Sequence, residues 1–268
     1  VDLLVVGAGF AGLYMLHKAR RMGLDAVVLE AAPSVGGTWY HNRYPGARVD
    51  IQSLEYSYSF DEALQQQWQW RERYAPQPEL LRYANHVADR FGLRDGIALN
   101  TRMSGAHFDE ATRRWQVRAD DGRQWSARYL VMASGPLSSP NRPDFPGLQD
   151  FKGSVFHTAD WPHEPVDFSG QRVAVVGTGS SAVQAIPIIA QQAKELTVFQ
   201  RTAAYAAPAR NGPLDRDFEA RIKADYAGFR ARNRRMHGGF GTLLPPNPVS
   251  ALAVSAEARD QAFEERWR

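Results

Sequence analysis

The amino-terminal residues follow a hydrophobic and polar pattern typical of a nucleotide-binding βαβ unit. Val1–Val6 is a largely apolar run, which favours a strand buried in a parallel sheet. It leads into Gly7–Gly12, after which apolar positions recur at helical spacing as far as Gly23. A second apolar stretch, Ala26–Leu29, ends at Glu30. The pattern predicts a strand, a tight turn, a helix and a second strand.

The glycine spacing gives the residues of this turn predicted roles in holding a dinucleotide. Gly7 permits the tight turn, Gly9 lets a pyrophosphate approach the backbone, and Gly12 allows the helix to pack closely on the strand. The helix, which begins with Phe10 and Ala11, then points its N-terminus at the phosphates. An ordinary tight turn is the alternative. The preceding strand, the following helix and the acidic residue at the next strand end favour nucleotide binding.

The same pattern recurs further along the chain, so we predict two nucleotide-binding units. Arg172–Val176 is another apolar strand, and a helix to about Ala193 and a strand Leu196–Gln200 follow its glycine-rich loop. Ala182 replaces the third glycine, a substitution that the pattern permits. The loop residues expected to meet the second nucleotide are Gly177, Thr178, Gly179, Ser180 and Ser181.

The two units differ at the residue that follows their second strand. Glu30 in the first unit can accept hydrogen bonds from a ribose 2′-hydroxyl, an arrangement that suits FAD and NAD alike. Arg201 stands at the equivalent place in the second unit and cannot accept such a bond. Together with the Thr202 hydroxyl it suits a 2′-phosphate, so the second site should prefer NADPH to NADH. An incidental surface arginine is the alternative.

The stretches between the two units predict scaffold elements. Pro78–Gly92 has the pattern of one amphipathic helix. Residues 106–134 predict a small antiparallel meander, with a turn at Asp121-Gly122 and a last strand at Tyr129–Ala133. The prolines of Pro136–Pro146 exclude a helix or a central strand and predict a domain boundary.

One basic cluster bears on possible partners. Apolar positions from Phe218 to Phe229 recur at helical spacing and predict one helix. The arginines near its end should form a solvated face rather than a nucleic-acid site, because the net charge is only +3 and arginine is scattered along the chain. These arginines are Arg230, Arg232, Arg234 and Arg235.

The carboxyl-terminal part predicts the start of a helical subdomain. Gly238-Gly239 and Pro245-Pro246 predict a loop, and a helix starts after Ser255 and reaches Arg268 without a stop signal. Since the chain also begins directly in a strand at Val1, we expect a fragment of a longer protein that is inactive alone. The predicted fold class is α/β, with two Rossmann-like dinucleotide-binding domains at 1–139 and 140–208 and the helical beginning at 209–268.

Composition excludes several kinds of chemistry. The 268-residue chain has no cysteine, which excludes disulfide frameworks, cysteine-ligated zinc, iron–sulfur clusters and thiol nucleophiles. Apolar runs fall far short of the roughly 20 residues of a membrane span, and clustered metal ligands are lacking, so we expect no membrane and no metal. A cytoplasmic location is compatible with the lack of cysteine. With two nucleotide sites and no thiol, electrons from NADPH should pass through a flavin to oxygen.

Two longer motifs resemble those of a known family. Phe151–Pro162 matches the F-x-G-x-x-x-H-T-x-x-W-P signature of flavin-dependent Baeyer–Villiger monooxygenases, and Gly36–Asp50 resembles a second motif of that family. The whole chain resembles the N-terminal half of the phenylacetone and cyclohexanone monooxygenase group. The resemblance implies FAD in the first domain and NADPH in the second. It also implies a reaction with O2 through a C4a-peroxyflavin, which inserts one oxygen next to the carbonyl of a ketone substrate and forms an ester or lactone.

The same resemblance implies site residues. Asp50 corresponds to a carboxylate beside the flavin that holds an active-site arginine, itself expected beyond residue 268; a cap or a surface acid is the alternative. His157 should act through positioning and domain motion rather than proton transfer, with a purely structural histidine as the alternative. Core packing is the alternative for Trp39 and Tyr56. The further residues expected at FAD are Gly37, Thr38, Trp39, Tyr56 and Met103.

Three departures from the family pattern leave the substrate open. His41, Val49 and Pro136 stand where relatives commonly carry other residues, and Pro136 could reshape the substrate pocket. A flavin monooxygenase that oxygenates nitrogen or sulfur, and a nucleotide-binding module without catalysis, are the alternative functions.

Overall fold

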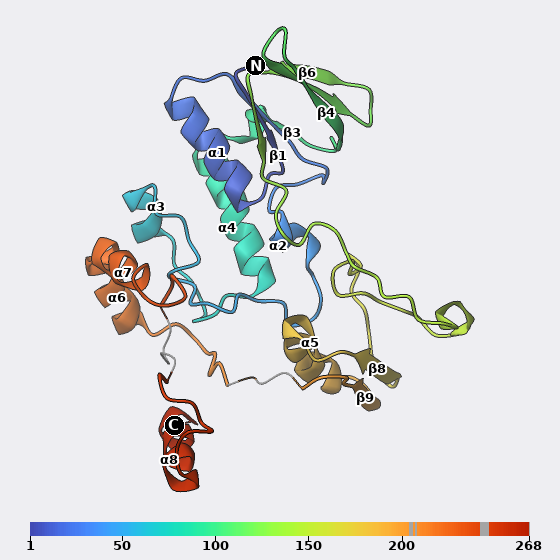
Figure 1. Ribbon diagram of the computed structural model, residues 1–268, viewed down its shortest axis with the longest axis vertical. Coiled ribbons are helices and arrows are strands. Elements are labelled where there is room, and N and C mark those ends of the chain that lie inside the picture. Colours follow the sequence, from blue (N-terminus) through green and yellow to red (C-terminus); the bar gives the residue numbers. More distant parts are fainter. Residues whose placement is uncertain (204–205, 207, 242–246, 268) are drawn as a thin grey trace. The chain divides into compact units, whose positions relative to one another are not determined.

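The computed structural model describes residues 1–203, 206, 208–241 and 247–267 (Figure 1). The chain divides into two compact units. The first unit comprises Val1–Ala47, Gln77–Val176 and Ser180–Val198, and the second comprises Arg48–Pro76, Gly177–Gly179 and Phe199–Arg268. The predicted domain limits at residues 139 and 208 separate regions expected to bind different nucleotides. The two compact units do not test these limits, which stay predictions.

A parallel sheet forms the centre of the first unit. Its strands are, in order, β3 (Ile97–Ala98), β2 (Ala26–Leu29), β1 (Leu3–Val6) and β7 (Tyr129–Met132). Leu3 is in register with Ala26 on one side and with Tyr129 on the other. The carboxyl ends of β2, β1 and β7 therefore lie side by side, at the edge where open α/β sheets bind their ligands.

Both faces of β1 are covered. Val5 belongs to a buried cluster with residues of α1 (Phe10–Arg21) and α4 (Gln77–Arg90). Leu4 points the other way and belongs to a second cluster with Val117 of the antiparallel sheet. This double burial explains why the strand is apolar at consecutive positions.

The antiparallel meander is confirmed in part. It consists of β4 (Met103–Asp109), β5 (Arg114–Ala119) and β6 (Gln124–Ala127), with Gly122 at φ +87° in the predicted turn. The prediction that Tyr129–Ala133 closes this meander is wrong, because β7 pairs in parallel with β1. Its Tyr-Leu-Val-Met sequence lacks polar alternation, which is typical of a strand in a covered parallel sheet.

The second strand, loop, helix and strand pattern is confirmed. β8 (Arg172–Val176) leads to α5 (Ser180–Ala190), which ends before the predicted Ala193, and β9 (Glu195–Phe199) pairs with β8. A small core of Phe168, Ala185 and Ile189 supports them. The short elements of this unit are α2 (Thr38–His41) and the 3-10 turns Arg94–Gly96 and Leu148–Asp150.

The second unit is built from helices. They are α3 (Glu62–Gln67), α6 (Arg216–Ala224), α7 (Tyr226–Asn233) and α8 (Ala256–Trp267). A single helix over Phe218–Phe229 is a wrong prediction, because Asp225 leaves the helical conformation at φ −140° and its carboxylate accepts the Gly228 N–H to begin α7. α8 confirms the helix predicted after Ser255, whereas Pro245-Pro246 lies outside the described residues.

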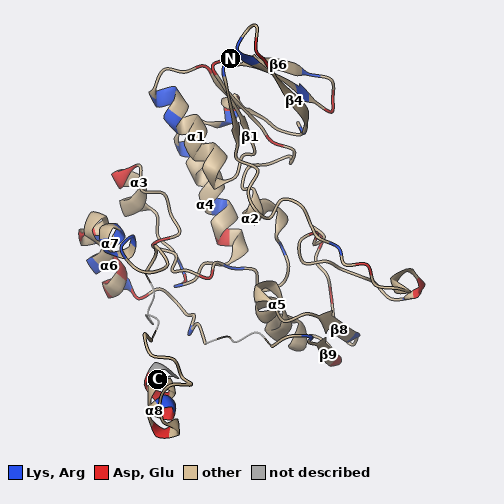
Figure 2. Ribbon diagram, in the orientation of Figure 1, with Lys and Arg blue, Asp and Glu red and all other residues tan. Residues whose placement is uncertain are grey.

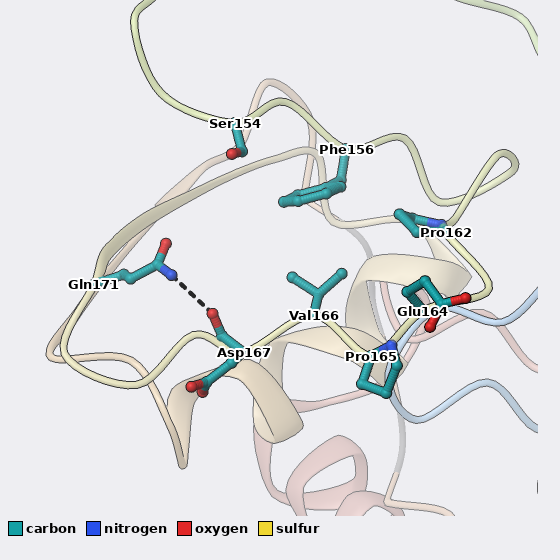
Figure 3. A pocket seen from close by; sticks show the side chains of 8 residues that line it. All are labelled: Ser154, Phe156, Pro162, Glu164, Pro165, Val166, Asp167 and Gln171. Carbon is teal, nitrogen blue, oxygen red and sulfur yellow. Dashed lines mark hydrogen bonds between the residues drawn. The ribbon is translucent and has the colours of Figure 1, made fainter.

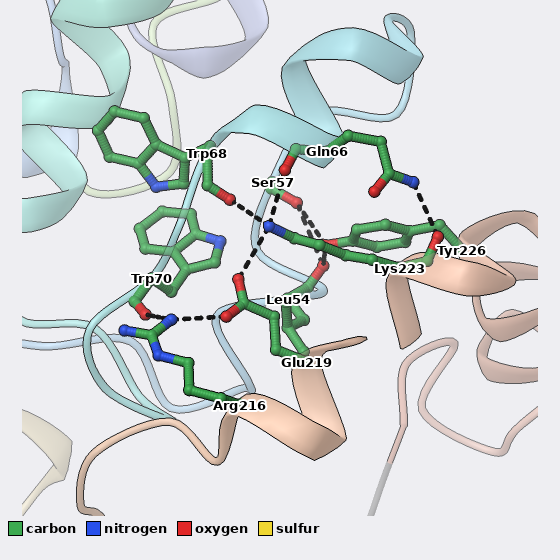
Figure 4. A network of polar contacts seen from close by, with 9 residues as sticks. All are labelled: Leu54, Ser57, Gln66, Trp68, Trp70, Arg216, Glu219, Lys223 and Tyr226. Atoms are coloured by element: carbon green, nitrogen blue, oxygen red, sulfur yellow. Dashed lines mark hydrogen bonds and ion pairs between the residues drawn. The ribbon is translucent and has the colours of Figure 1, made fainter. Parts of the chain in front are cut away.

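A buried acid ties α6 to the segment before α4 (Figure 4). Glu219 is only 5% exposed and forms ion pairs with Arg216 and Lys223. The Lys223 ammonium also donates to the carbonyl oxygens of Gln66 and Trp68 at 2.9 and 2.8 Å, so it faces two carbonyl groups and one carboxylate. The network is typical of a fixed contact rather than a solvated charge pair.

Arg230 does not lie on a solvated face, so that part of the prediction is wrong. Its guanidinium donates to the Ser57 hydroxyl and the Gln65 side chain at 2.9 Å each, and it stacks 4.7 Å from the Tyr226 ring. Burial raises the pKa of the Tyr226 hydroxyl, which donates to the Leu54 carbonyl. The arginines that are exposed as predicted are Arg232, Arg234 and Arg235.

Charged residues are distributed over both units. Figure 2 shows lysines and arginines on most helices and on several strands, interspersed with acidic residues. No helix in the described part of the chain is both long and apolar enough to cross a membrane.

Replacing Glu219 with glutamine should lower the free energy of unfolding by about 2 kcal/mol, because a nearly buried lysine loses its counter-charge. Urea denaturation measures the difference. Asp217→Asn on the same helix is the matched control, since Asp217 is exposed, and it should leave the midpoint unchanged. Equal effects of the two substitutions would contradict the buried network.

Candidate nucleotide-binding sites

The first glycine-rich loop has the close contacts that its predicted role requires. Gly7 has φ +102°, and a Cβ there would lie 2.6 Å from the carbonyl oxygen of Ala133 at the end of β7. A Cβ on Gly12 would overlap the Gly7 carbonyl oxygen. Gly9 is the N-cap of α1 and carries no side chain to cap the first-turn amides of Phe10 and Ala11. The loop therefore offers a helix N-terminus to an anion.

Glu30 has a second role that the sequence did not suggest. It is 6% exposed, and its two carboxylate oxygens accept the backbone N–H groups of Ala8 at 2.6 Å and Ala32 at 2.8 Å. A carboxylate has about four lone-pair positions, so each oxygen keeps one for a ribose hydroxyl. Glu30 thus stabilises the glycine loop through these hydrogen bonds and can still accept a hydrogen bond from a ligand hydroxyl.

The Gly36–Ala47 segment lies directly against this loop. The Gly36 N–H donates to the Ala8 carbonyl at 3.0 Å, and a Cβ on Gly37 would lie 2.8 Å from the Gly9 Cα. Two glycines distant in sequence therefore pack backbone against backbone, and a side chain on Gly37 would collide with Gly9. Thr38 opens α2 beside it.

Trp39 and Met103 have structural contacts of their own. Trp39 is 8% exposed, and its carbonyl accepts from the Gln77 side chain. Met103 begins β4 opposite Ala119, and the segment before it is anchored by the Thr101 N–H, which donates to the Glu30 carbonyl at 2.8 Å. Contact of either residue with a flavin stays a prediction.

Asp50 and Tyr56 belong to the second compact unit, in Arg48–Pro76. Asp50 is exposed, and the Tyr56 N–H donates to the Gln52 carbonyl at 3.1 Å within a turn. The proximity of both residues to FAD stays a prediction.

The second loop repeats the turn of the first without its close neighbours. Gly177 also has φ +102°, but a Cβ on Gly177 or Gly179 meets no atom of the described chain within 4 Å. The Thr178 hydroxyl accepts from the Gln200 side chain at 2.8 Å, which joins this loop to the end of β9. α5 begins with the next residues, Ser180 and Ser181, and Arg201 and Thr202 follow β9 and are exposed.

His157 is held in a turn by its own backbone. Its Nδ1 accepts the Ala159 N–H at 3.2 Å and its carbonyl accepts the Asp160 N–H at 2.9 Å. Asp160 in turn pairs with Arg142. Because Nδ1 accepts this hydrogen bond, the ring helps to hold the turn, and the positioning role of His157 stays a prediction.

The signature also borders a cavity of about 320 Å³ (Figure 3). Phe156 and Val166 supply its apolar wall, and Glu164 and Asp167 stand at its edge. Phe156 packs against Trp161 with ring centroids 5.4 Å apart. No group of three or more potential metal-ligating side chains occurs among the residues that the structure describes.

Sequence comparison assigns the family. The family model described as pyridine nucleotide-disulphide oxidoreductase matches residues 4–227, and the chain belongs to that family. Because the chain has no cysteine, it shares the fold of this family without the thiol pair that a disulphide reaction requires.

Individual relatives confirm the predicted resemblance. A Baeyer–Villiger monooxygenase of Pseudooceanicola batsensis is 44% identical over 270 residues, which span 100% of this chain and 49% of that protein. The phenazine N-monooxygenase PhzNO1 of Lysobacter antibioticus is 43% identical over 99% of this chain and 49% of its own length. A structure of oxidized steroid monooxygenase bound to NADP superposes with a TM-score of 0.89 at 55% identity, over 99% of this chain and 50% of that one. The chain spans about half the length of these relatives.

Proposed function

We propose that this chain is the FAD- and NADPH-binding half of an oxygen-dependent monooxygenase that converts a ketone to an ester or lactone. The observation that carries the proposal is the pair of glycine loops with the same φ of +102° and opposite charges after their second strands, Glu30 and Arg201. Opposite charges indicate two different nucleotides in one chain.

The residues fit FAD at the first loop. The α1 N-terminus suits a pyrophosphate, the glycines at positions 9 and 37 let two backbone segments approach closely beside it, and Glu30 has free acceptor positions for a ribose. Bound FAD supplies the redox chemistry, since it takes two electrons from NADPH and passes them to oxygen. The overall reaction balances as ketone, NADPH, O2 and a proton giving ester, NADP⁺ and water.

Within that reaction the chain's own residues bind and orient. Ser180 and Ser181 present the α5 N-terminus to the NADPH pyrophosphate, and Arg201 with Thr202 meets its 2′-phosphate. By the whole protein we mean a protein that contains this chain and has the length of its relatives. In it, Asp50 orients the active-site arginine, which we expect outside the present chain.

Arg201→Gln in the whole protein should raise the KM for NADPH about 30-fold, the loss of roughly 2 kcal/mol of charge-assisted hydrogen bonding, and leave the KM for NADH unchanged. Steady-state kinetics with both nucleotides measure the split. Arg172 is the first residue of β8, at the end of that strand away from the glycine loop. Arg172→Gln is therefore the matched control and should leave both KM values unchanged. An equal loss for NADPH and NADH would show that Arg201 does not contact the 2′-phosphate.

The function is tested by product identity. The whole protein, supplied with NADPH, oxygen and a cyclic ketone, should form the lactone in step with NADPH consumption, measured by gas chromatography. Because one relative is named a phenazine N-monooxygenase, nitrogen oxygenation is the second candidate, and phenazine N-oxide without lactone would favour it. If no NADPH is consumed, the result would favour the remaining alternative, a nucleotide-binding module without catalysis. The cytoplasmic location stays a prediction.

A further inference from the structure

The Gly36–Ala47 segment and the second nucleotide-binding pattern share one hydrophobic cluster. Phe168, Ala185 and Ile189 are buried at its centre, and Tyr44 and Trp161 pack against it. Tyr44 comes from the segment beside the first loop, Trp161 from the Phe151–Pro162 signature, and the two buried α5 residues from the helix that follows the second loop. All of these residues belong to the first compact unit.

A tight turn seats this segment on α5. The Ala47 N–H donates to the Tyr44 carbonyl at 3.1 Å, and Gly46 has φ +78°, the geometry of a type II turn with Pro45 at its first corner. A Cβ on Gly46 would overlap the Gln184 carbonyl oxygen and lie 3.2 Å from the Ile188 side chain. Glycine is therefore required both for the turn and for the close approach to the helix.

A side-chain hydrogen bond fixes the same contact. The Tyr44 hydroxyl donates to Gln184 Oε1 at 2.9 Å, and Tyr44 is half-buried. Nearby, the Tyr40 ring packs 5.1 Å from His163, and Arg43 lies 5.0 Å from the Tyr40 ring. Burial lowers the pKa of His163, and Arg43 and His41 add to the effect, so the uncharged form of the ring is favoured in this packing.

These contacts connect the N-terminal turn of α5 with the segment beside the first loop, all within the first compact unit. α5 starts at Ser180, one residue after Gly179, and Gln184 lies one turn into the helix. Gln184 holds Tyr44, and the other end of the same segment places Gly37 against Gly9 of the first loop. A ligand that fixes the α5 N-terminus therefore restrains, through two contacts, the backbone beside the first loop.

We propose that Tyr44 and Gln184 are positioning residues that couple nucleotide binding at the second loop to the Gly36–Ala47 segment at the first. The inference rests on the proposed function, in which these loops hold NADPH and FAD. Neither side chain reacts. By linkage the coupling is reciprocal, so the state of the segment also sets the affinity for the second nucleotide.

The test uses the whole flavin-loaded protein and two direct readouts. Amide hydrogen exchange of residues 40–47 should slow when NADP⁺ is added to the wild type, and this protection should be lost in Tyr44→Phe and Gln184→Leu. The same variants should weaken NADP⁺ binding and slow flavin reduction by NADPH about tenfold each, and the double variant should be no worse than either single one. Gln184→Glu keeps an acceptor for the tyrosine hydroxyl and should restore the wild-type behaviour.

A matched control separates coupling from loss of a tyrosine hydroxyl. Tyr129→Phe removes an exposed hydroxyl from β7 and should change neither readout. Protection and reduction rates that stay at the wild-type level in Tyr44→Phe and Gln184→Leu would overturn the coupling. A wild type that NADPH does not reduce would overturn the proposed function itself, whereas reduction without ester formation would overturn only the ketone reaction.

Discussion

Replacing Gly12 with alanine should abolish tight FAD binding and lower the free energy of unfolding by about 3 kcal/mol. The added Cβ would overlap the carbonyl oxygen of Gly7, a backbone atom that cannot rotate away. The helix would have to move off β1, and the first-turn amides would leave the position that a pyrophosphate needs. Flavin content of the purified protein and urea denaturation measure the two effects.

Two comparisons make this prediction specific. The second loop carries Ala182 at the equivalent position, so the fingerprint as such tolerates alanine, and the cost belongs to the crowding around Gly7. Gly105→Ala in β4 is the matched control, because a Cβ there meets no described atom within 4 Å. We expect it to keep both flavin and stability. A Gly12→Ala protein that keeps stoichiometric flavin would contradict the close packing of α1 on the turn.

The two loops and their flanking elements could be predicted from the sequence because their causes are local. A glycine with φ +102°, a strand before it and a helix after it lie within a few residues of one another. The position of Tyr129–Met132 directly after a hairpin suggests a strand of the meander, which is wrong. Its continuous apolar sequence indicates instead a strand of the covered parallel sheet. Propensity and spacing thus predict where helices and strands occur better than they predict which strands pair with one another.

Contacts between residues distant in sequence could not be predicted in this way. Arg230 was expected in solvent, but its acceptors are Ser57 and Gln65, which a helical period near residue 230 cannot reveal. The same holds for Tyr44 and Gln184, whose side chains meet across 140 positions. Such contacts depend on how whole elements dock, and periodicity records only that a position is buried or exposed.

The candidate site shows the same division. Glu30 was identified from its place after β2, but its hydrogen bonds to Ala8 and Ala32 depend on the path of the loop above it. Its substitution would therefore disturb the loop as well as the ribose contact. A residue identified from a sequence motif can thus also stabilise the fold through hydrogen bonds that the motif does not predict.

Asp50→Asn in the whole protein should lower the rate of ketone oxygenation about 100-fold and leave FAD binding and stability unchanged. The amide keeps the size of the carboxylate but removes the charge that would hold the active-site arginine. Within the described part of the chain, the Asp50 carboxylate is exposed and makes no hydrogen bond or ion pair, so the fold does not depend on it. Product formation, flavin content and the unfolding midpoint measure the three quantities.

An acid of the same segment should give the opposite result. Asp61 is the N-cap of α3, where its carboxylate accepts the Leu64 N–H at 2.6 Å. Asp61→Ala should cost about 1 kcal/mol of stability and leave the oxygenation rate unchanged. If Asp50→Asn instead destabilised the protein and kept its turnover, Asp50 would be a structural acid like Asp61, and the carboxylate that orients the arginine would have to be sought elsewhere.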